Sequence, residues 1–235
     1  MKELQVKKKR KSEDKEEEVL RLKRRWREEE EGVPDVTFII EQLSLKRSEG
    51  KIPTAAFLRV SSLLLHVIDQ IGPTMVVLRE DIRRNIQRLE SSYMADPLAN
   101  SCLAEIIKKE VDAGAARAGE SSSRAVLWLT RSMDFSVALV EGLEGDPEAS
   151  LERLVEEAYE TTLKPWHGWI STAAYKVALK LVPHRRKLVE LVVGEGEDSD
   201  SLKGGIRTLV SLLRPLLSEI HVLLGESRLD RLKSA

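Results

Sequence analysis

The sequence has few of the residues on which several classes of protein depend. It holds one cysteine, Cys102, which excludes an internal disulfide and a cysteine-rich zinc or iron–sulfur site. Lysine plus arginine (38) nearly equals aspartate plus glutamate (39), so no strong overall attraction to nucleic acid follows. No run of about 18 uncharged apolar residues occurs, which argues against a signal peptide and a membrane span. We expect a cytosolic protein of one domain that is stabilised by packing.

Sequence motifs of common enzyme classes are also missing. There is no Gly-x-Ser-x-Gly elbow, no His-Glu-x-x-His pair, no phosphate-binding loop and no Gly-x-Gly-x-x-Gly after a strand. His66, His184 and His221 have no cysteine or histidine partner at the spacing of metal ligands. Asp81 and His167 could form an acid/base pair, but nothing supplies a nucleophile. We therefore expect no catalysis, no cofactor and no metal site.

Charge is concentrated at the N-terminus, where 22 of residues 1–31 are Lys, Arg, Asp or Glu. Residues 1–33 are predicted to be an extension that is disordered or an exposed helix, followed by a domain over residues 34–235. The run Lys7-Lys8-Lys9-Arg10-Lys11 is typical of nuclear import signals and of segments that meet anionic lipids, and equally of a solvated tail. A helical protein that binds nucleic acid through this run is one hypothesis, although no nucleic acid partner is expected.

From Pro34 onward, apolar residues recur every three or four positions, as in helices that bury one face. The two clearest stripes are Phe57, Val60, Leu64, Ile68, Ile71 and Ile206, Leu209, Leu213, Leu216, Ile220, Leu223. Helix boundaries are predicted at Gly72-Pro73, Asp96-Pro97, Ser121–Ser123, Asp146-Pro147, Pro183 and a loop over Gly194–Gly205. Alternating strand patterns are missing. The sequence predicts one all-α domain with about eight helices between Pro34 and Leu224.

Two stretches carry polar or aromatic groups that could form a binding site. Spacings of four and three residues place Asp81, Asn85 and Arg88 on one helical face, where together they could hold a polyhydroxylated group. The alternative is an exposed helix with an Asp–Arg pair. In Trp166-His167-Gly168-Trp169, a histidine flanked by tryptophans is either a site wall or a packed core residue. Trp128 is either a flat platform for a sugar ring or core.

These residues make the sequence resemble the glycolipid transfer proteins, most closely the plant members. The matching blocks are Asp81-Ile-x-x-Asn85-Ile-x-Arg88-Leu, Leu127-Trp128-Leu-Thr-Arg131-x-Met-Asp-Phe135, Ala158-Tyr159-x-x-x-Leu163-Lys-x-Trp166-His167-Gly168-Trp169 and Ala178-Leu-Lys-Leu-x-Pro183. The likeness runs from about Ile52 to the C-terminus. It implies a two-layer helical sandwich in which the lipid chains lie between the layers.

The resemblance also implies residue roles at a headgroup site. Asp81 and Asn85 would bond the hydroxyls of the first sugar with help from Arg88, Trp128 would stack under the ring, and His167 would meet the ceramide linkage. Asp81 would also take the ceramide amide N–H. The ligand-binding residues expected on this basis are Asp81, Asn85, Arg88, Trp128, His167, Tyr159 and Arg124.

The function implied is that of a non-enzymatic carrier which moves a glycosphingolipid between membranes. At about 0.8 kcal/mol per buried CH₂, a lipid with roughly thirty methylenes loses over 20 kcal/mol on entering water, so free desorption is slow. One alternative is a carrier of ceramide-1-phosphate, because Arg124 stands where that branch of the family has a phosphate-binding arginine. Trp128 and Asn85 depart from that branch. A second alternative is a lipid sensor or adaptor that presents a surface to a protein partner.

A surface for transient membrane contact is predicted beside the histidine. Trp169 and Ile170 begin the helix that follows, and Lys164 lies nearby to meet lipid phosphate. The alternative is that Trp169 is a core residue. We expect a monomer in the cytosol, with nuclear entry through residues 7–11 as an open option.

Overall fold

We analysed a computed structural model of the chain, which describes residues 13–24, 26, 51–72, 75–182, 184–188 and 199–234, without certain side chains between 199 and 209. Within these ranges the chain is helical and has no β-strand, apart from an isolated bridge between Pro53 and Cys102. The prediction of an all-α domain is therefore confirmed.

The helices follow one another with short connections. The elements are α3 (Thr54–Ile71), α4 (Val76–Ala95), α5 (Leu103–Asp112), α6 (Ser122–Gly145), α7 (Leu151–Thr162), the 3₁₀ helix η3 (Lys164–Trp166), α8 (Trp169–Leu179) and α10 (Ser199–Glu226). Most predicted boundaries are confirmed, because the residues that mark them cap or end helices. Ser121 Oγ, for example, accepts a hydrogen bond from Arg124 N at 3.1 Å and caps α6.

One predicted boundary is partly wrong. The loop expected over Gly194–Gly205 does not include residues 199–205, because α10 begins at Ser199, and residues 194–198 lie outside the described residues. Ser199 and Asp200 are favourable at a helix N-terminus, and the long apolar stripe that follows outweighs the cost of Gly204 and Gly205 inside the helix.

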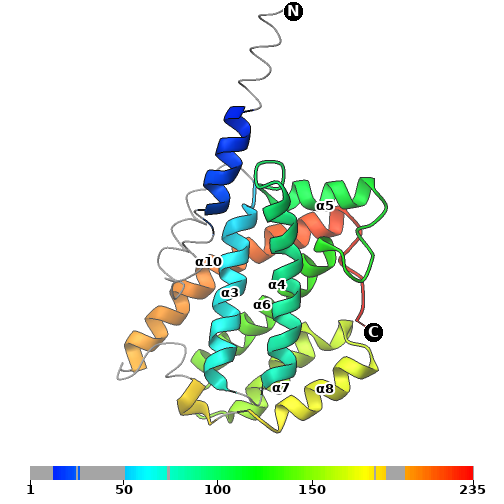
Figure 1. Cartoon of the computed structure of the whole chain (residues 1–235). Coiled ribbons are helices and arrows are strands. Elements are labelled where there is room, and N and C mark those ends of the chain that lie inside the picture. The colour runs from blue at the N-terminus through cyan, green and yellow to red at the C-terminus, as the bar shows by residue number, and fades with distance from the viewer. Residues whose placement is uncertain are drawn as a thin grey trace, which may run out of the picture.

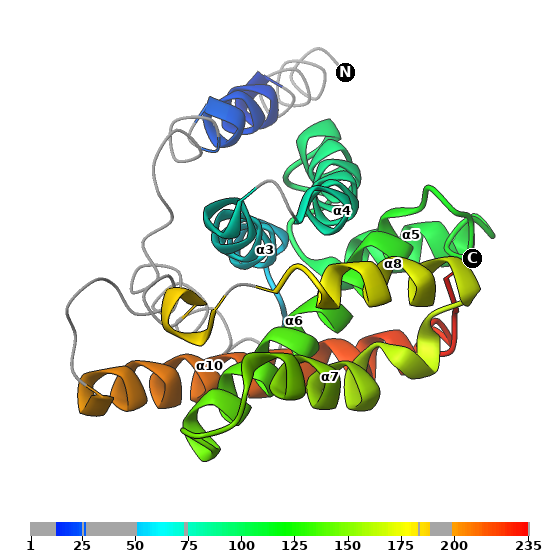
Figure 2. The ribbon, with the colours of Figure 1, turned by 90° about the horizontal axis from the view of Figure 1, so that it is seen from below.

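The helices pack in two layers. Figures 1 and 2 show α3 and α4 side by side on one side of the molecule, with α6, α7 and α10 on the other. The main core lies between them and includes the fully buried Phe57, Leu89, Leu127 and Ile220. A second apolar cluster, built around Leu143, joins the end of α6 to α7 and α8. The predicted two-layer helical sandwich is confirmed.

Helix α3 has the length and composition of a membrane-crossing helix, with a mean hydropathy of 1.2. Arg59 and Asp69 interrupt it, in agreement with the missing uncharged run. Phe57, Leu58 and Val60 bury its inner face in the core. Its composition is therefore accounted for by core packing between the layers.

Part of the N-terminal extension contacts the domain. Residues 13–24 are helical and mostly exposed, whereas the side chain of Trp26 is only 6% exposed. Trp26 packs edge-on against Tyr93 with ring centroids 5.6 Å apart, and its Nε1 donates to Glu90 Oε1 at 2.7 Å. The run of residues 7–11 and the proposed boundary at residues 33–34 lie outside the described residues.

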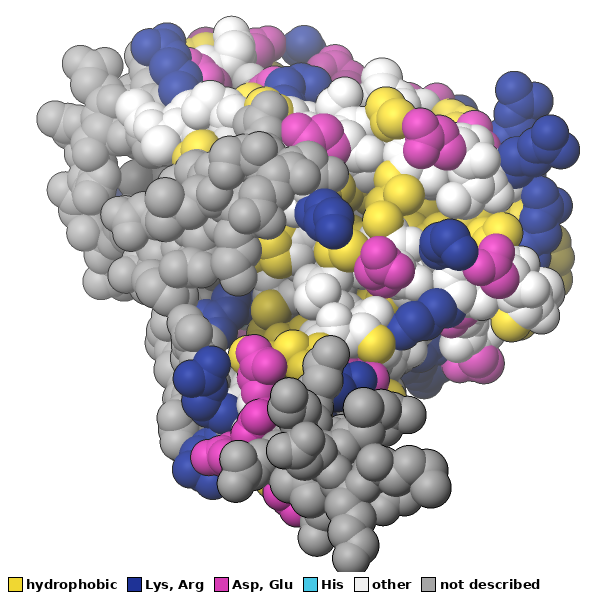
Figure 3. All heavy atoms as spheres, turned by 90° about the horizontal axis from the view of Figure 1, so that it is seen from above, with side chains coloured by type: hydrophobic (Ala, Val, Ile, Leu, Met, Phe, Trp, Pro, Cys, Tyr) yellow, Lys and Arg dark blue, Asp and Glu magenta, His cyan; other side chains and the backbone are white. Residues whose placement is uncertain are grey.

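A ladder of ion pairs joins α10 to α6. Arg207, Arg214 and His221, spaced by seven residues on α10, contact the carboxylates of Glu144, Glu141 and Asp134 in turn. The two helices therefore run antiparallel. On the face drawn in Figure 3, basic and acidic side chains are likewise interspersed, as expected for a chain of net charge −1.

Candidate functional site

Helix α4 holds a column of three polar side chains that begins at Asp81. Asn85 is buried at 3% exposure, and its Nδ2 donates to the Asp81 backbone oxygen at 2.9 Å. Arg88 Nη1 donates to Asn85 Oδ1 at 3.3 Å. The predicted column therefore exists as one connected group, and these two bonds fix the orientation of the Asn85 amide.

The Asp81 carboxylate differs from the side chains of Asn85 and Arg88 because it makes no hydrogen bond with another described residue. Within the part of the chain that the structure describes, no group donates a hydrogen bond to its oxygens. Desolvation by the surrounding protein raises the pKa of Asp81 although much of its surface is exposed, and the charges of Arg88 and Arg84 oppose this rise. Arg84 and Arg88 are themselves paired with Glu80 and Glu120. Asp81 is thus a charged acceptor with unused capacity.

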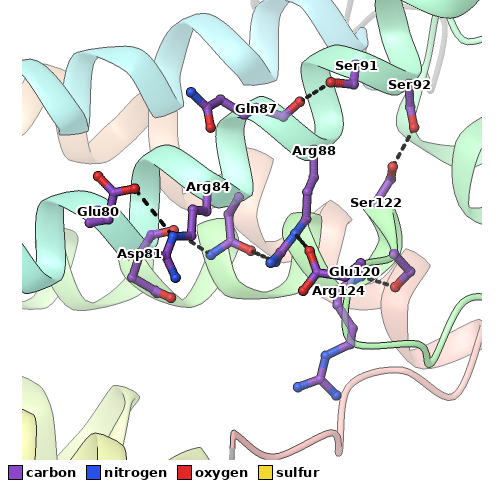
Figure 4. Close-up of polar contacts among 12 residues, drawn as sticks. Glu80, Asp81, Arg84, Gln87, Arg88, Ser91, Ser92, Glu120, Ser122 and Arg124 are labelled. Atoms are coloured by element: carbon purple, nitrogen blue, oxygen red, sulfur yellow. Dashed lines mark hydrogen bonds and ion pairs between the residues drawn. The ribbon is translucent and has the colours of Figure 1, made fainter.

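Helix α6, which packs against α4, carries Trp128. The hydroxyls of Ser92 on α4 and Ser122 on α6 lie 2.6 Å apart, and the two helices run antiparallel from that contact (Figure 4). Asn85 precedes Ser92 by as many residues as Leu129 follows Ser122, so the two lie at the same level. Trp128, beside Leu129, is partly buried, and we infer from this register that it lies toward the Asp81–Asn85 end of the column.

His167 lies between Trp128 and Tyr159. Its ring centroid is 5.8 Å from that of Trp128 and 5.5 Å from that of Tyr159. The Tyr159 hydroxyl lies 3.2 Å from His167 Nδ1, which leaves Nε2 for a ligand. Burial, and to a lesser degree the charge of Arg131, lowers the pKa of His167, so its imidazole is neutral at neutral pH.

Tyr159 supports this histidine from within the fold. It is 2% exposed, and its ring stacks on Tyr175 of α8 with centroids 3.4 Å apart. The Tyr175 hydroxyl is buried without a hydrogen-bond partner among the described residues, and burial raises its pKa to about 12. In this structure Tyr159 positions His167 instead of offering an exposed surface, so its predicted ligand contact stays a prediction.

Arg131 contacts the rings of both Trp128 and Trp166. Its guanidinium lies 4.8 Å from the Trp128 ring centroid and 4.3 Å from that of Trp166, in the geometry of cation–π contacts. It is 2% exposed, and burial lowers its pKa to about 10. Its Nη1 and Nη2 donate to the backbone oxygens of Leu232 and Asp230, each at 2.7 Å.

Residues 228–234, here called the C-terminal strap, hold the histidine segment from the other side. Ser234 N donates to the Trp166 backbone oxygen at 2.9 Å, and Gly168 N donates to Ser234 Oγ at 2.9 Å. His167 is the residue between these two. The strap therefore supports the predicted site, although no aromatic residue lies within it.

Arg124 is also engaged by the strap. Its Nη2 donates to the Lys233 backbone oxygen at 3.2 Å, and its guanidinium points away from Asp81 and Arg88 (Figure 4). The structure does not bring Arg124 together with the polar column of α4. Its predicted contact with an anionic headgroup stays a prediction.

The residues predicted to meet a membrane are exposed. Trp169 is 80% exposed and Ile170 is 51% exposed, which contradicts the core alternative for Trp169. Val177, farther along α8, is 61% exposed. Lys164 is paired with Glu160, its Nζ lying 2.6 Å from Glu160 Oε2. The start of α8 thus offers an apolar surface, and the charge of the nearby Lys164 is paired with that of Glu160.

Other parts of the described chain offer less. No group of three or more metal-ligating side chains occurs in them. A hollow of about 430 Å³ at the start of the strap is lined by Arg117, Arg228 and Asp230 among others, and by none of the predicted headgroup residues. The Asp81, Trp128 and His167 region is therefore the candidate binding site.

The helical sandwich is a GLTP fold. Two solved structures share its fold: FAPP2, described as selecting simple glycosphingolipids with the GLTP fold, and human ceramide-1-phosphate transfer protein in complex with 12:0 ceramide-1-phosphate. For FAPP2 the TM-score is 0.71 at 22% identity, over 79% of this chain and 90% of that one. For the human protein the TM-score is 0.69 at 18% identity, over 77% and 90%.

Sequence comparison gives the family. The family model described as glycolipid transfer protein matches residues 52–194. Glycolipid transfer protein 3 of Arabidopsis thaliana is 46% identical over 183 residues, which are 78% of each chain. Glycolipid transfer protein 2 of the same plant is 44% identical over 220 residues, or 90% of this chain and 99% of that one. This chain belongs to the glycolipid transfer protein family.

Proposed function

We propose that this protein is a non-enzymatic carrier that binds a glycosphingolipid and transfers it between membranes. The observation that carries the proposal is the Asp81 carboxylate, which is partly desolvated and has no hydrogen-bond donor among the described residues. Such an acceptor favours a ligand with several neighbouring donors, and the hydroxyls of a sugar together with the ceramide amide N–H supply them.

The remaining side chains would complete recognition of an uncharged sugar. Asn85 and Arg88 present an amide and a guanidinium next to Asp81. The Trp128 ring offers an apolar face to the sugar ring. His167 is neutral, so its Nε2 can serve a lipid amide or hydroxyl without adding charge. No step in this cycle makes or breaks a covalent bond.

The lipid chains require an apolar space next to the polar site. Partly buried side chains from α6 and α8, Phe135, Leu139 and Leu179 among them, pack against the second apolar cluster. They lie on the helices that carry Trp128 and follow His167, and we propose that the chains enter there. The exposed Trp169 and Ile170 would dock transiently on the membrane while the chains cross. The protein would act as a cytosolic monomer.

A carrier of ceramide-1-phosphate is the second candidate. The observation in its favour is the group of three arginines on α4, namely Arg83, Arg84 and Arg88. All three are within 4.0 Å of a carboxylate oxygen, Arg83 and Arg84 sharing Glu80 and Arg88 contacting Glu120, so a phosphate would have to compete with these carboxylates for each guanidinium. The free charged group of the column is the anionic Asp81, which favours an uncharged sugar.

Transfer between vesicles tests the proposal. Labelled galactosylceramide and labelled ceramide-1-phosphate with the same chains are offered in donor vesicles, and their appearance in acceptor vesicles is followed. We expect galactosylceramide to move catalytically, with many lipids transferred per protein. Faster movement of the phosphorylated lipid would favour the second candidate, and stoichiometric extraction without transfer would favour a sensor or adaptor. Mass spectrometry of co-purifying lipid gives an independent check.

A further inference from the structure

Arg88, the last member of the polar column, also contacts Glu120, a residue from another part of the chain. Its Nε donates to Glu120 Oε2 at 2.6 Å, while its Nη1 donates to Asn85 Oδ1 at 3.3 Å. Glu120 belongs to the connection between α5 and α6, next to the cap residue Ser121. Figure 4 shows Arg88 reaching from α4 toward Glu120. The carboxylate thus occupies the one guanidinium of the proposed headgroup column.

The two partners are held to different degrees. The side chain of Arg88 is 25% exposed and contacts the buried Asn85, whereas that of Glu120 is 82% exposed. An exposed ion pair of this kind contributes little to stability. Glu120 can therefore leave Arg88 without disturbing the helices, but a ligand must displace it to use the full guanidinium.

The other charges on α4 do not replace Glu120. Arg83 and Arg84, three and four residues after Glu80, share its carboxylate as their partner. Asp81 remains as the acceptor of the column and lies close enough to Arg88 for that charge to affect its pKa. Glu120 is consequently the residue that sets whether the column presents an available positive charge.

We propose that Glu120 is a specificity-determining residue which disfavours sphingolipids with a sulfated or phosphorylated headgroup. This inference rests on the proposed function. An uncharged sugar can bond Asp81 and Asn85 while Arg88 stays paired with Glu120. A sulfate or phosphate seeks a bidentate contact with the guanidinium and must first displace the carboxylate, against the repulsion between two anions.

Competition between two lipids that differ only in charge tests this role. Galactosylceramide and sulfated galactosylceramide with identical chains are offered together in zwitterionic vesicles, and the ratio of their transfer rates is measured. Glu120→Gln keeps the shape of the side chain and removes its charge, so we expect the ratio of sulfated to uncharged lipid to rise about two- to fivefold. The matched control is Glu148→Gln, an exposed glutamate between α6 and α7, which should leave the ratio unchanged.

A double variant tests whether Glu120 acts through the Arg88 guanidinium. Adding Arg88→Gln to Glu120→Gln should remove the gain for the sulfated lipid, because the gain requires the freed guanidinium. An unchanged ratio in Glu120→Gln, with galactosylceramide transfer intact, overturns the role of Glu120 and leaves the proposed function standing. An equal rise in Glu148→Gln overturns it too, since general charge would then explain the effect. Failure of the folded wild-type protein to transfer either lipid overturns the proposed function and this inference with it.

Discussion

Replacing Asp81 by asparagine should separate ligand binding from stability. The substitution preserves the size of the side chain and removes its charge. Among the described residues, Asp81 is the one member of the column whose side chain makes no hydrogen bond. A hydrogen bond to a charged group contributes about 1.5–3 kcal/mol, and a ligand donor left unpaired costs a similar amount. Loss of one such bond corresponds to a roughly 10- to 100-fold weaker affinity for galactosylceramide. The transfer rate at low lipid concentration should fall in proportion.

Stability should respond in the opposite direction. The pKa of Asp81 is raised in the folded state, mainly by burial, so ionised Asp81 is held less favourably in the folded than in the unfolded chain. Removing the charge should leave the thermal midpoint at pH 7 unchanged or raise it. Because both states are protonated below the unfolded pKa of 3.8, this difference should vanish at lower pH.

Thermal unfolding and vesicle transfer, measured on the same preparations, check both parts. Glu105→Gln, at an exposed glutamate of α5, is the matched control for loss of one negative charge and should transfer normally. The reasoning is refuted if Asp81→Asn transfers galactosylceramide like the wild type. It is equally refuted if the midpoint falls by several degrees, because Asp81 would then be a structural residue.

Three further substitutions address the platform, the membrane contact and the ion-pair ladder. Trp128→Ala should lower transfer strongly with helicity retained, because stacking is worth about 0.5–1.5 kcal/mol beyond buried area. Trp169→Ala should lower vesicle partitioning and transfer together while binding of a short-chain soluble glycolipid stays nearly unchanged. His221→Gln should destabilise the protein more at pH 6 than at pH 8, by about 1 kcal/mol or less, as seen in thermal midpoints. The hydrogen bond that His221 Nε2 donates to the Asp134 carboxylate raises the pKa of His221, so the stability this contact contributes is present below the unfolded pKa of 6.5 and lost as pH rises through the folded value.

Each of these expectations has a contrary result. Normal transfer by Trp128→Ala would place the sugar elsewhere. A fall in soluble-ligand binding as large as the fall in transfer would assign Trp169 to the binding site. A destabilisation by His221→Gln that is independent of pH would mean that packing, and not the charge shared with Asp134, holds that contact.

Local patterns explain why much of the fold was predictable. Phe57, Val60 and Ile68 recur at helical spacing and are buried, as their periodicity indicates. Asp81, Asn85 and Arg88 form a column because four- and three-residue spacings fix one face of any helix. These features depend on neighbours within a few turns, and the helix caps do as well.

The features that the sequence does not predict depend on contacts between segments that are far apart along the chain. Glu120 was overlooked because its partner Arg88 lies 32 residues away, and nothing local marks the pair. Trp26 docks on Tyr93 although the segment around it is almost entirely charged. The one available signal for the strap was the spacing of seven residues between Arg117, Arg124 and Arg131, whose guanidinium groups all donate to its backbone oxygens.

The C-terminal strap has a consequence for the order in which the protein forms. Arg131 and Leu232 are 101 residues apart, and Gly168 and Ser234 are 66 apart, so both contacts close long loops. Closure of such loops is slow compared with the growth of a helix. Leu229 of the strap belongs to the main core, and α10 meets α6 across a loop of similar length, with His221 and Asp134 87 residues apart. We therefore expect the segment around His167 to be fastened in the same slow step that completes the core, so that the binding site and the compact shape form together.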